Sequence, residues 1–192
     1  MTAILKTFAV VTLGVALGLL STWLAVERGH GFGAVSAGVW TSWPKTGSMD
    51  ADPYGRAVVA RTGEVPLGVA EGLSFLARTD ASGDELTGRC EYFLQSPVPT
   101  GRFWTITPLT LDGGRFAGTG ERSGMTSGEI VRRADGSFEI VLSREVRPGN
   151  WIPLGKPEPF QLMLRVYDTQ VSSTAAAIDV RVTPRVVRGK CA

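Results

Sequence analysis

The feature that most constrains this chain is an uncharged apolar run close to its start. Residues 8–26 read FAVVTLGVALGLLSTWLAV, a stretch of 19 residues without a charged side chain. As an α-helix such a run spans about 28 Å, close to the thickness of the hydrocarbon core of a bilayer. The sequence therefore predicts one transmembrane helix within residues 1–27.

A cleaved signal peptide is the alternative interpretation of this run. Signal peptides have shorter apolar regions and end in a small-x-small cleavage motif, whereas Trp23-Leu24-Ala25 places a bulky residue where a small one is needed. We therefore expect a retained membrane anchor. Lys6 is positive on one side of the run, while Glu27 and Arg28 cancel on the other. The positive-inside rule then predicts a single-pass protein of a bacterial inner membrane, with its C-terminal domain in the periplasm.

The rest of the chain divides into a linker and one domain. Residues 28–50 are rich in Gly and Ser and predict a juxtamembrane linker, in which Trp40 and Trp43 either enter the lipid headgroup region or pack on the domain. His30 is expected to be a solvated loop residue of this linker. Residues 51–192 are long enough for a single domain with its own core.

Charge and cysteine content exclude several classes of protein. The formal net charge is +2 and the basic residues are dispersed, so no nucleic-acid partner is expected. One histidine and two cysteines cannot supply a zinc site, and we expect no metal or cofactor. In an oxidising compartment Cys90 and Cys191 favour a disulfide, for which chain-entropy models give about 4 kcal/mol of stabilisation. Two unrelated thiols are the alternative.

Most of residues 51–192 carries β-strand signals. A short helix precedes them, with Asp52 as its N-cap, Pro53 at its first position and Gly63 as its stop. Turns rich in Gly, Pro and Asp separate the strands, and Asp135-Gly136 gives the clearest hairpin signal. This pattern predicts a mainly β fold, an antiparallel sandwich or jelly roll. The predicted strands are Leu73–Thr79, Cys90–Gln95, Phe103–Leu111, Glu129–Arg133, Ser137–Leu142, Phe160–Tyr167 and Asp179–Val187.

Two ordered motifs resemble a known family. Residues 101–107 read GRFWTIT and precede Asp112-Gly113, and residues 148–153 read PGNWIP and precede 159–167, PFQLMLRVY. Over about residues 52–191 the chain resembles bacterial domain-of-unknown-function family 1214. Leu111 stands where the family has a tyrosine before Asp-Gly, which weakens any role for that position. The resemblance implies a β-sandwich-like fold behind one membrane helix, and it implies no established activity.

Catalytic patterns are weak in this sequence. A Ser-His-Asp triad requires a histidine base, and the single histidine lies beside the predicted anchor. Glu121, Glu139 and Asp168 are available to a two-carboxylate hydrolase, but no spacing places two of them together. Acidic residues at strand edges are commonly just solvated.

The strongest candidates for binding lie within the two motifs. They are Trp104, Asn150, Trp151, Arg165, Tyr167 and Asp168. Strand alternation in residues 162–167 would place Arg165 beside Met163 and Tyr167 on one face, an arrangement suited to contact with a carboxylate or carbonyl. One interpretation is a concave site for a polar or sugar-like ligand. The other, which we favour, is structural: Trp151 closes the end of the sandwich, and Arg165 pairs with Asp168 or Glu139.

The sequence therefore predicts a non-enzymatic binding or structural module of the cell envelope. The alternative is an enzyme that acts on a cell-envelope glycan or a small metabolite. The expected partners are the membrane, through the N-terminal helix, and either an envelope protein or a small polar ligand. A contact with lipid or protein through Trp40 and Trp43 would require both to be exposed near the anchor. No oligomeric state is predicted.

Overall fold

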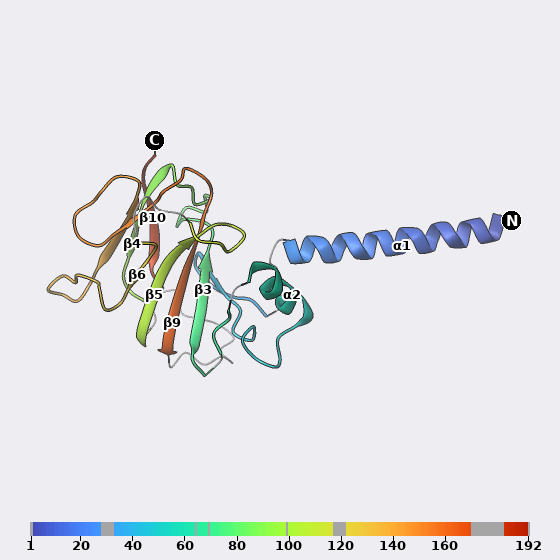
Figure 1. Cartoon of the computed structure of the whole chain (residues 1–192), viewed down its shortest axis with the longest axis horizontal. Coiled ribbons are helices and arrows are strands. Elements are labelled where there is room, and N and C mark those ends of the chain that lie inside the picture. Colours follow the sequence, from blue (N-terminus) through green and yellow to red (C-terminus); the bar gives the residue numbers. More distant parts are fainter. Residues whose placement is uncertain are drawn as a thin grey trace.

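An isolated helix and a β-domain make up the computed structural model, which describes residues 2–27, 33–63, 65–68, 70–98, 100–116, 122–169 and 183–191. Helix α1 (Thr2–Glu27) projects away from the domain (Figure 1). Within it, Ala3–Val26 is long and apolar enough to cross a membrane, and none of that segment is buried. The helix is compatible with a membrane anchor or with a signal sequence. His30 lies outside the described residues.

Two sheets form the domain. The larger sheet has six strands in the order β1-β2-β3-β9-β5-β6, and every neighbouring pair is antiparallel. Its strands are β1 (Val35–Ala37), β2 (Trp40–Ser42), β3 (Gly72–Ala77), β9 (Gln161–Thr169), β5 (Gly101–Leu109) and β6 (Met125–Thr126).

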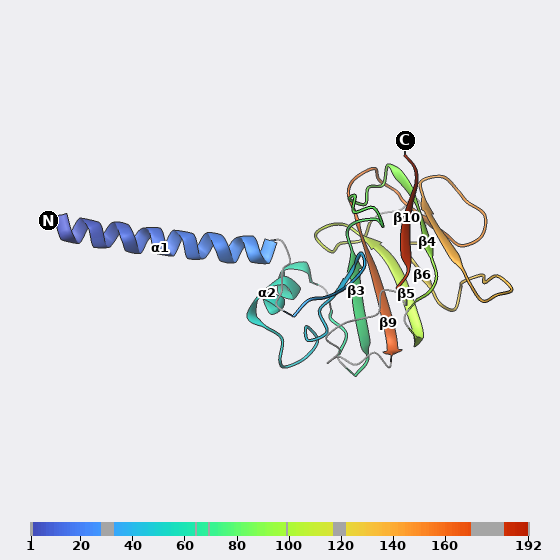
Figure 2. The same cartoon turned by 180° about the vertical axis from the view of Figure 1, so that it is seen from behind.

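The smaller sheet has four strands in the order β10-β4-β7-β8. Its strands are β10 (Arg185–Cys191), β4 (Cys90–Gln95), β7 (Glu139–Ser143) and β8 (Trp151–Pro153). Figure 2 shows β10 and β4 side by side, with the C-terminus leaving the domain at the end of β10. The mainly β, sandwich-like fold is confirmed, although β7 and β8 pair in parallel.

The core lies between the two sheets and follows the alternation of the strands. In β9, Leu162, Leu164 and Val166 face inward and are almost fully buried. Opposite them, β4 contributes Tyr92 and Leu94, also fully buried. Burial of such side chains is worth roughly 1.5–3 kcal/mol each, so this alternation is what holds the sheets face to face. Other large buried side chains are Trp40, Phe75, Ile106, Phe116, Ile140, Leu142, Ile152 and Phe160.

The segment predicted to be a linker contributes strands to the larger sheet. β2 pairs with β3, and Trp40 is fully buried with its indole N–H donating to the Pro184 carbonyl oxygen at 2.7 Å. The described part of residues 28–50 is thus integrated into the domain from Val35 onward. The Gly- and Ser-rich composition hid two strands of three residues each, which are too short to show alternation.

Helix α2 (Pro53–Thr62) forms as the capping signals predict. The Asp52 carboxylate accepts hydrogen bonds from the backbone N–H groups of Tyr54 and Gly55, both at 3.0 Å. Gly63 ends the helix with φ 65°, a left-handed conformation that glycine adopts without strain. In Figure 1, α2 lies where α1 meets the β-domain.

Glu129–Arg133, predicted to be a strand, is not one. The Asn150 side chain binds its backbone instead, accepting from the Val131 N–H and donating to the Val131 carbonyl, both at 2.8 Å. A side chain thus replaces the neighbouring strand. The turn at Asp135-Gly136 does form, with Gly136 at φ 82°. Of Asp179–Val187, only 183–187 is described, and β10 begins at Arg185.

Candidate functional site

The outer face of the larger sheet, turned away from the core, carries the candidate site. In β9, Met163, Arg165 and Tyr167 point to this face, as the predicted alternation requires. Antiparallel register places Met163 between Leu76 of β3 and Thr107 of β5. The same register places Arg165 beside Thr105. Three strands therefore place a row that contains Leu76 and Met163 next to a row that contains Arg165 and Thr105.

Helix α2 and the segment around Trp43 cover this face and enclose a pocket of about 360 Å³. We call it the outer pocket. Its apolar walls come from the sheet and from the cover: Trp43, Val58, Val59, Leu76, Leu109 and Met163. Its polar lining is Thr46, Arg78, Thr105, Thr107, Gln161 and Arg165. A pocket with apolar walls and a few convergent polar groups is the usual form of a small-molecule site.

Two arginines, Arg78 and Arg165, contribute to the polar lining of the outer pocket. The Arg78 Nε donates to the Gln161 Oε1 at 3.1 Å, and the Gln161 Nε2 donates to the Thr110 carbonyl oxygen at 2.9 Å. Partial burial lowers the pKa of Arg78 from its ordinary value, yet a guanidinium stays protonated at physiological pH. No Asp or Glu occurs among the described residues that line the pocket. The pocket therefore offers a small ligand apolar surface together with hydrogen-bonding groups.

Two further hollows adjoin the outer pocket. A small hollow of about 80 Å³ is also lined by Trp43. A wider, more polar groove shares Val58, Arg78 and Leu111 with the outer pocket and extends to Val26 at the end of α1. One end of the outer pocket therefore opens towards the apolar helix.

Trp104 and Arg165, both predicted to bind a ligand, lie on opposite faces of the larger sheet. Trp104 is paired with Val166 and points inward, where its ring stacks on Phe138 with centroids 5.3 Å apart. Only 5% of Trp104 is exposed, so it cannot reach a ligand at Arg165. Arg165 alone of the six predicted residues lines the outer pocket.

Asn150 and Trp151 belong to the smaller sheet. Besides binding Val131, the Asn150 Nδ2 donates to the Glu139 carbonyl oxygen at 3.0 Å, so its amide is saturated by backbone. The Trp151 Nε1 donates to the Ser143 carbonyl oxygen at 3.2 Å. Both residues stabilise the connection around β7 and β8.

Tyr167 and Asp168 lie at the far end of β9 from Gln161. The Tyr167 ring packs against Phe103 at 5.8 Å, and Asp168 is exposed with φ 50°. The Asp168 N–H donates to the Glu71 carbonyl oxygen at 2.8 Å. This end of the strand is separate from the outer pocket.

The two described candidate carboxylates, Glu139 and Asp168, are not assembled into a catalytic pair. Glu139 lies on the smaller sheet, where it accepts from Gln95 and lies 3.8 Å from Arg133. Asp168 lies on the larger sheet, and Glu121 falls outside the described residues.

A contact with lipid or protein through Trp40 and Trp43 would require both side chains to be exposed. Trp40 is fully buried, so the two tryptophans do not form an exposed pair.

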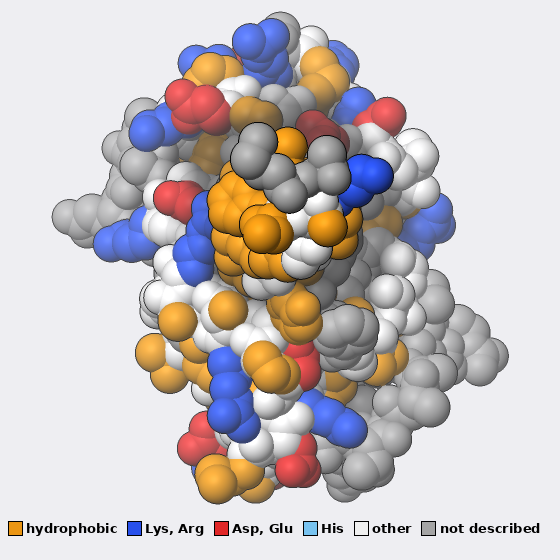
Figure 3. Space-filling model, turned by 90° about the vertical axis from the view of Figure 1, so that its right-hand side faces the viewer, with side chains coloured by type: hydrophobic (Ala, Val, Ile, Leu, Met, Phe, Trp, Pro, Cys, Tyr) orange, Lys and Arg blue, Asp and Glu red, His pale blue; other side chains and the backbone are white. Residues whose placement is uncertain are grey.

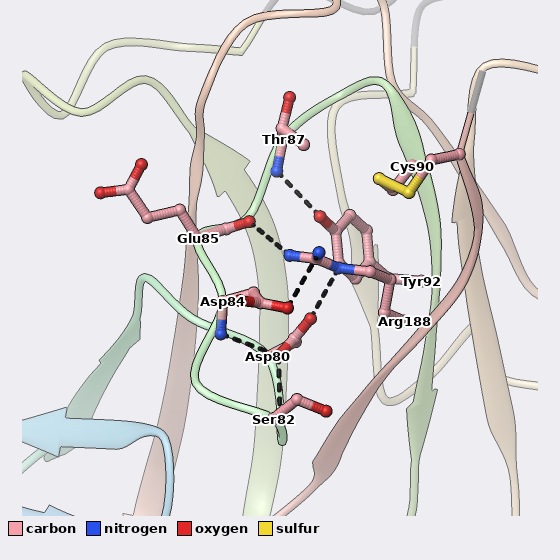
Figure 4. A network of polar contacts seen from close by, with 9 residues as sticks. Asp80, Ser82, Asp84, Glu85, Thr87, Cys90, Tyr92 and Arg188 are labelled. Carbon is pink, nitrogen blue, oxygen red and sulfur yellow. Dashed lines mark hydrogen bonds and ion pairs between the residues drawn. A yellow bond between two sulfur atoms is a disulfide. The ribbon is translucent and has the colours of Figure 1, made fainter.

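A second polar cluster lies between the sheets at the C-terminal strand (Figure 4). We call it the Asp80 network. Asp80, 1% exposed, forms an ion pair with Arg188 at 2.7 Å and accepts from the N–H groups of Ser82 and Asp84. The Tyr92 hydroxyl accepts from the Thr87 N–H at 2.9 Å, and burial raises the pKa of Tyr92. An ion pair and hydrogen bonds to the backbone connect these groups, which is the arrangement of a structural network.

The disulfide between Cys90 and Cys191 is confirmed and lies next to the Asp80 network. It joins β4 to the last residues of β10, which are 101 residues apart in sequence. A disulfide of this kind is typical of domains outside the cytoplasm.

Sequence reasoning missed most of the outer pocket. Thr105 and Thr107 lie inside a quoted motif, and their outward direction follows from alternation about Trp104. Arg78 lies within the predicted strand Leu73–Thr79, just after the end of the observed β3, and Trp43 lies in the predicted linker. What the sequence could not supply was the position of α2 over this face, since that depends on contacts distant in sequence.

These features define a protein with an apolar N-terminal helix and a β-sandwich-like domain, which has a pocket on the outer face of its larger sheet. The family described as Protein of unknown function (DUF1214) matches residues 71–171. The chain belongs to that family, and the resemblance noted in the sequence is confirmed.

Solved structures show the same fold. The VPA0106 protein from Vibrio parahaemolyticus is similar over 73% of this chain and 36% of its own, with a TM-score of 0.54 and 20% identity. An uncharacterised protein from Burkholderia cenocepacia is similar over 92% of this chain and 42% of its own, with a TM-score of 0.50 and 19% identity. The chain thus spans less than half the length of these two proteins. No curated protein sequence matches it.

Proposed function

We propose that this protein is a non-enzymatic binding module, tethered to the bacterial inner membrane by α1, that binds a small ligand in the outer pocket from the periplasmic side. The observation that carries the proposal is the lining of the pocket. Two guanidinium groups and several hydroxyl and amide groups face a space with otherwise apolar walls. Apolar walls with a few convergent polar groups are the usual form of a small-molecule site.

Two features support the tether and the compartment. The side chains of α1 are exposed around the whole helix; Leu5, Phe8 and Leu19 are each more than two-thirds exposed. Figure 3 looks along α1 and shows hydrophobic side chains over much of its surface. A surface of this kind is stable in lipid and unfavourable in water. The disulfide supports a periplasmic domain, since thiols in the cytoplasm are kept reduced.

Native mass spectrometry of the full chain, extracted in a mild detergent, tests the proposal. We expect the wild type to carry an adduct of discrete mass. Thr107→Trp and Val59→Trp fill the pocket from the sheet side and from the α2 side, and each is expected to remove the adduct. Arg102→Gln changes an exposed arginine on the same strand as Thr107 and serves as the control that retains it.

Two results would contradict the proposal. One is an adduct that persists in both tryptophan variants, because the ligand would then lie elsewhere. The other is an extracted ligand that returns with a changed mass after incubation with purified protein, which would favour an enzyme acting on a glycan or small metabolite. Carbonate extraction of membranes checks the tether: release of the protein into the supernatant would contradict it.

A further inference from the structure

The end of α1 lies against the β-domain. Residues 3–23 of the helix are exposed, whereas Leu24, Ala25 and Val26 are half-buried. α1 is in contact with α2, and Val26 lines a groove together with Val58 of α2. The last turn of the apolar helix therefore fixes which side of the domain is next to it.

This contact determines which face of the domain lies nearest a bilayer. Ala3–Val26 is a segment of 24 residues, about 36 Å of helix, whereas the hydrocarbon core is about 30 Å thick. When α1 spans a bilayer, its last turn therefore lies near the level of the lipid headgroups. Trp23, 56% exposed, lies where interfacial tryptophans commonly occur. The face of the domain that carries α2 then lies at the same level.

Three apolar side chains project from this face. Met49 is 92% exposed, Val65 is 79% exposed and Leu111 is 52% exposed. The Nη2 of Arg56 in α2 donates to the Met49 carbonyl oxygen at 2.7 Å, which holds Met49 beside the helix. Val65 follows α2 in the chain, and Leu111 lines the same groove as Val26. We call Met49, Val65 and Leu111 the α2 surface.

The position of the α2 surface distinguishes it from other exposed apolar residues. In Figures 1 and 2, α2 and the segment that leads into it from β2 form the side of the domain nearest α1. Figure 3 faces this side and shows hydrophobic side chains beside the helix. Val131 and Val146 are also exposed, but they belong to the β6–β7 and β7–β8 connections, which lie on the opposite side of the domain in Figure 1. Single exposed apolar residues are ordinary, whereas a group next to an apolar helix indicates an interaction surface.

We propose that the α2 surface rests on the bilayer that α1 spans, with Met49 and Val65 inserted among the lipid headgroups. The partner is lipid because the surface adjoins the helix that the tether places in the bilayer. Transfer of apolar side chains from water into the interface is favourable, and a second attachment beside α1 holds the domain in one orientation. This inference rests on the tether of the proposed function and is independent of the ligand in the outer pocket.

Site-specific fluorescence quenching tests the inference with the full chain in vesicles of phosphatidylethanolamine and phosphatidylglycerol. Each variant carries one added cysteine, labelled with nitrobenzoxadiazole, and a lipid with a nitroxide near its headgroup is the quencher. Met49→Cys and Val65→Cys report on the α2 surface. Val131→Cys and Val146→Cys are the matched controls, because these valines are 68% and 77% exposed. We expect quenching at least about threefold stronger on the α2 surface than at the controls, since only the former lies within the headgroup layer.

A label in the middle of α1, at Leu13→Cys, separates the inference from the tether. We expect it to be quenched by a lipid with a nitroxide deep in its acyl chain. If Leu13 is quenched but Met49 and Val65 are quenched no more than the controls, the inference is overturned and the tether stands. Absence of quenching at Leu13 would contradict both. In every variant, the mass of the labelled protein verifies that the Cys90–Cys191 disulfide remains closed.

The emission wavelength of the Met49 and Val65 labels distinguishes lipid from a protein partner. Emission shifted to the blue together with quenching by the headgroup nitroxide supports the inference. A blue shift without quenching would show that protein covers the surface, and it would overturn the inference. The adduct in the outer pocket tests the ligand separately, because Thr107→Trp and Val59→Trp remove or retain it whatever the labels report.

Discussion

The Asp80 network and the outer pocket use charged side chains in opposite ways. In the Asp80 network, the Asp80 carboxylate is almost completely buried and is surrounded by Arg188 and two backbone N–H groups. In the outer pocket, Arg78 and Arg165 line a space large enough for another molecule. Charged groups that are buried against each other hold strands in place, whereas groups that line a cavity can also contact a ligand. The first region is therefore expected to determine stability and the second to determine binding.

Removal of the disulfide is the change with the largest expected effect on this comparison. Cys90→Ser together with Cys191→Ser frees the end of β10 and should lower the free energy of unfolding by about 4 kcal/mol, because the bridge closes a long loop. Urea denaturation followed by tryptophan fluorescence measures this loss. The adduct in the outer pocket should persist where the variant is folded, and its disappearance there would contradict the separation of the two regions.

Asp80→Ala should have the next largest effect, about 3 kcal/mol, because it leaves the partly buried Arg188 and two backbone N–H groups without their main acceptor. Asp80→Asn is the matched control. Its amide oxygen can still accept from Ser82 and Asp84, so we expect a smaller loss. The same denaturation experiment compares them. Equal losses would show that the ion pair with Arg188 carries most of this stability and that the backbone contacts carry little.

Asp52→Ala tests whether α2 matters to both properties. Loss of an N-cap side chain costs about 1 kcal/mol, because two backbone N–H groups lose their acceptor. Because α2 covers the outer pocket, the fraction of protein that carries the adduct should fall by more than the loss of about 1 kcal/mol in stability explains. Native mass spectrometry and urea denaturation are measured on the same sample. An unchanged adduct would mean that the first turn of α2 does not shape the pocket.

Thr107→Val should have the smallest effect on stability, within about 0.5 kcal/mol. The threonine is half-buried on the outer face, and valine has nearly the same shape and favours strands. If the Thr107 hydroxyl faces ligand, the adduct should weaken while the unfolding midpoint stays constant. A lower midpoint with an unchanged adduct would assign the hydroxyl to the fold.

Local signals in the sequence were sufficient for some elements and not for others. The capping residues around α2 predicted both of its ends, and alternation in β9 predicted which side chains face outward. Glu129–Arg133 was misassigned because the Asn150 side chain, distant in sequence, binds its backbone. The predicted site combined Trp104 with Arg165 because each of them lies in one of the two motifs. Register places them on opposite faces, and register is set by pairing that no short motif reveals.

Arg165→Gln gives the most direct test of the central claim, because Arg165 was expected from sequence either to bind a ligand or to hold strands together. Adduct retention and the free energy of unfolding are measured on the same purified full-length variant, with Arg102→Gln beside it. The account predicts that the adduct is lost while the free energy of unfolding falls by less than it does in Asp80→Ala, because Arg165 lines a cavity and not the core. A loss of several kcal/mol with the adduct intact would contradict it and would make Arg165 a structural residue.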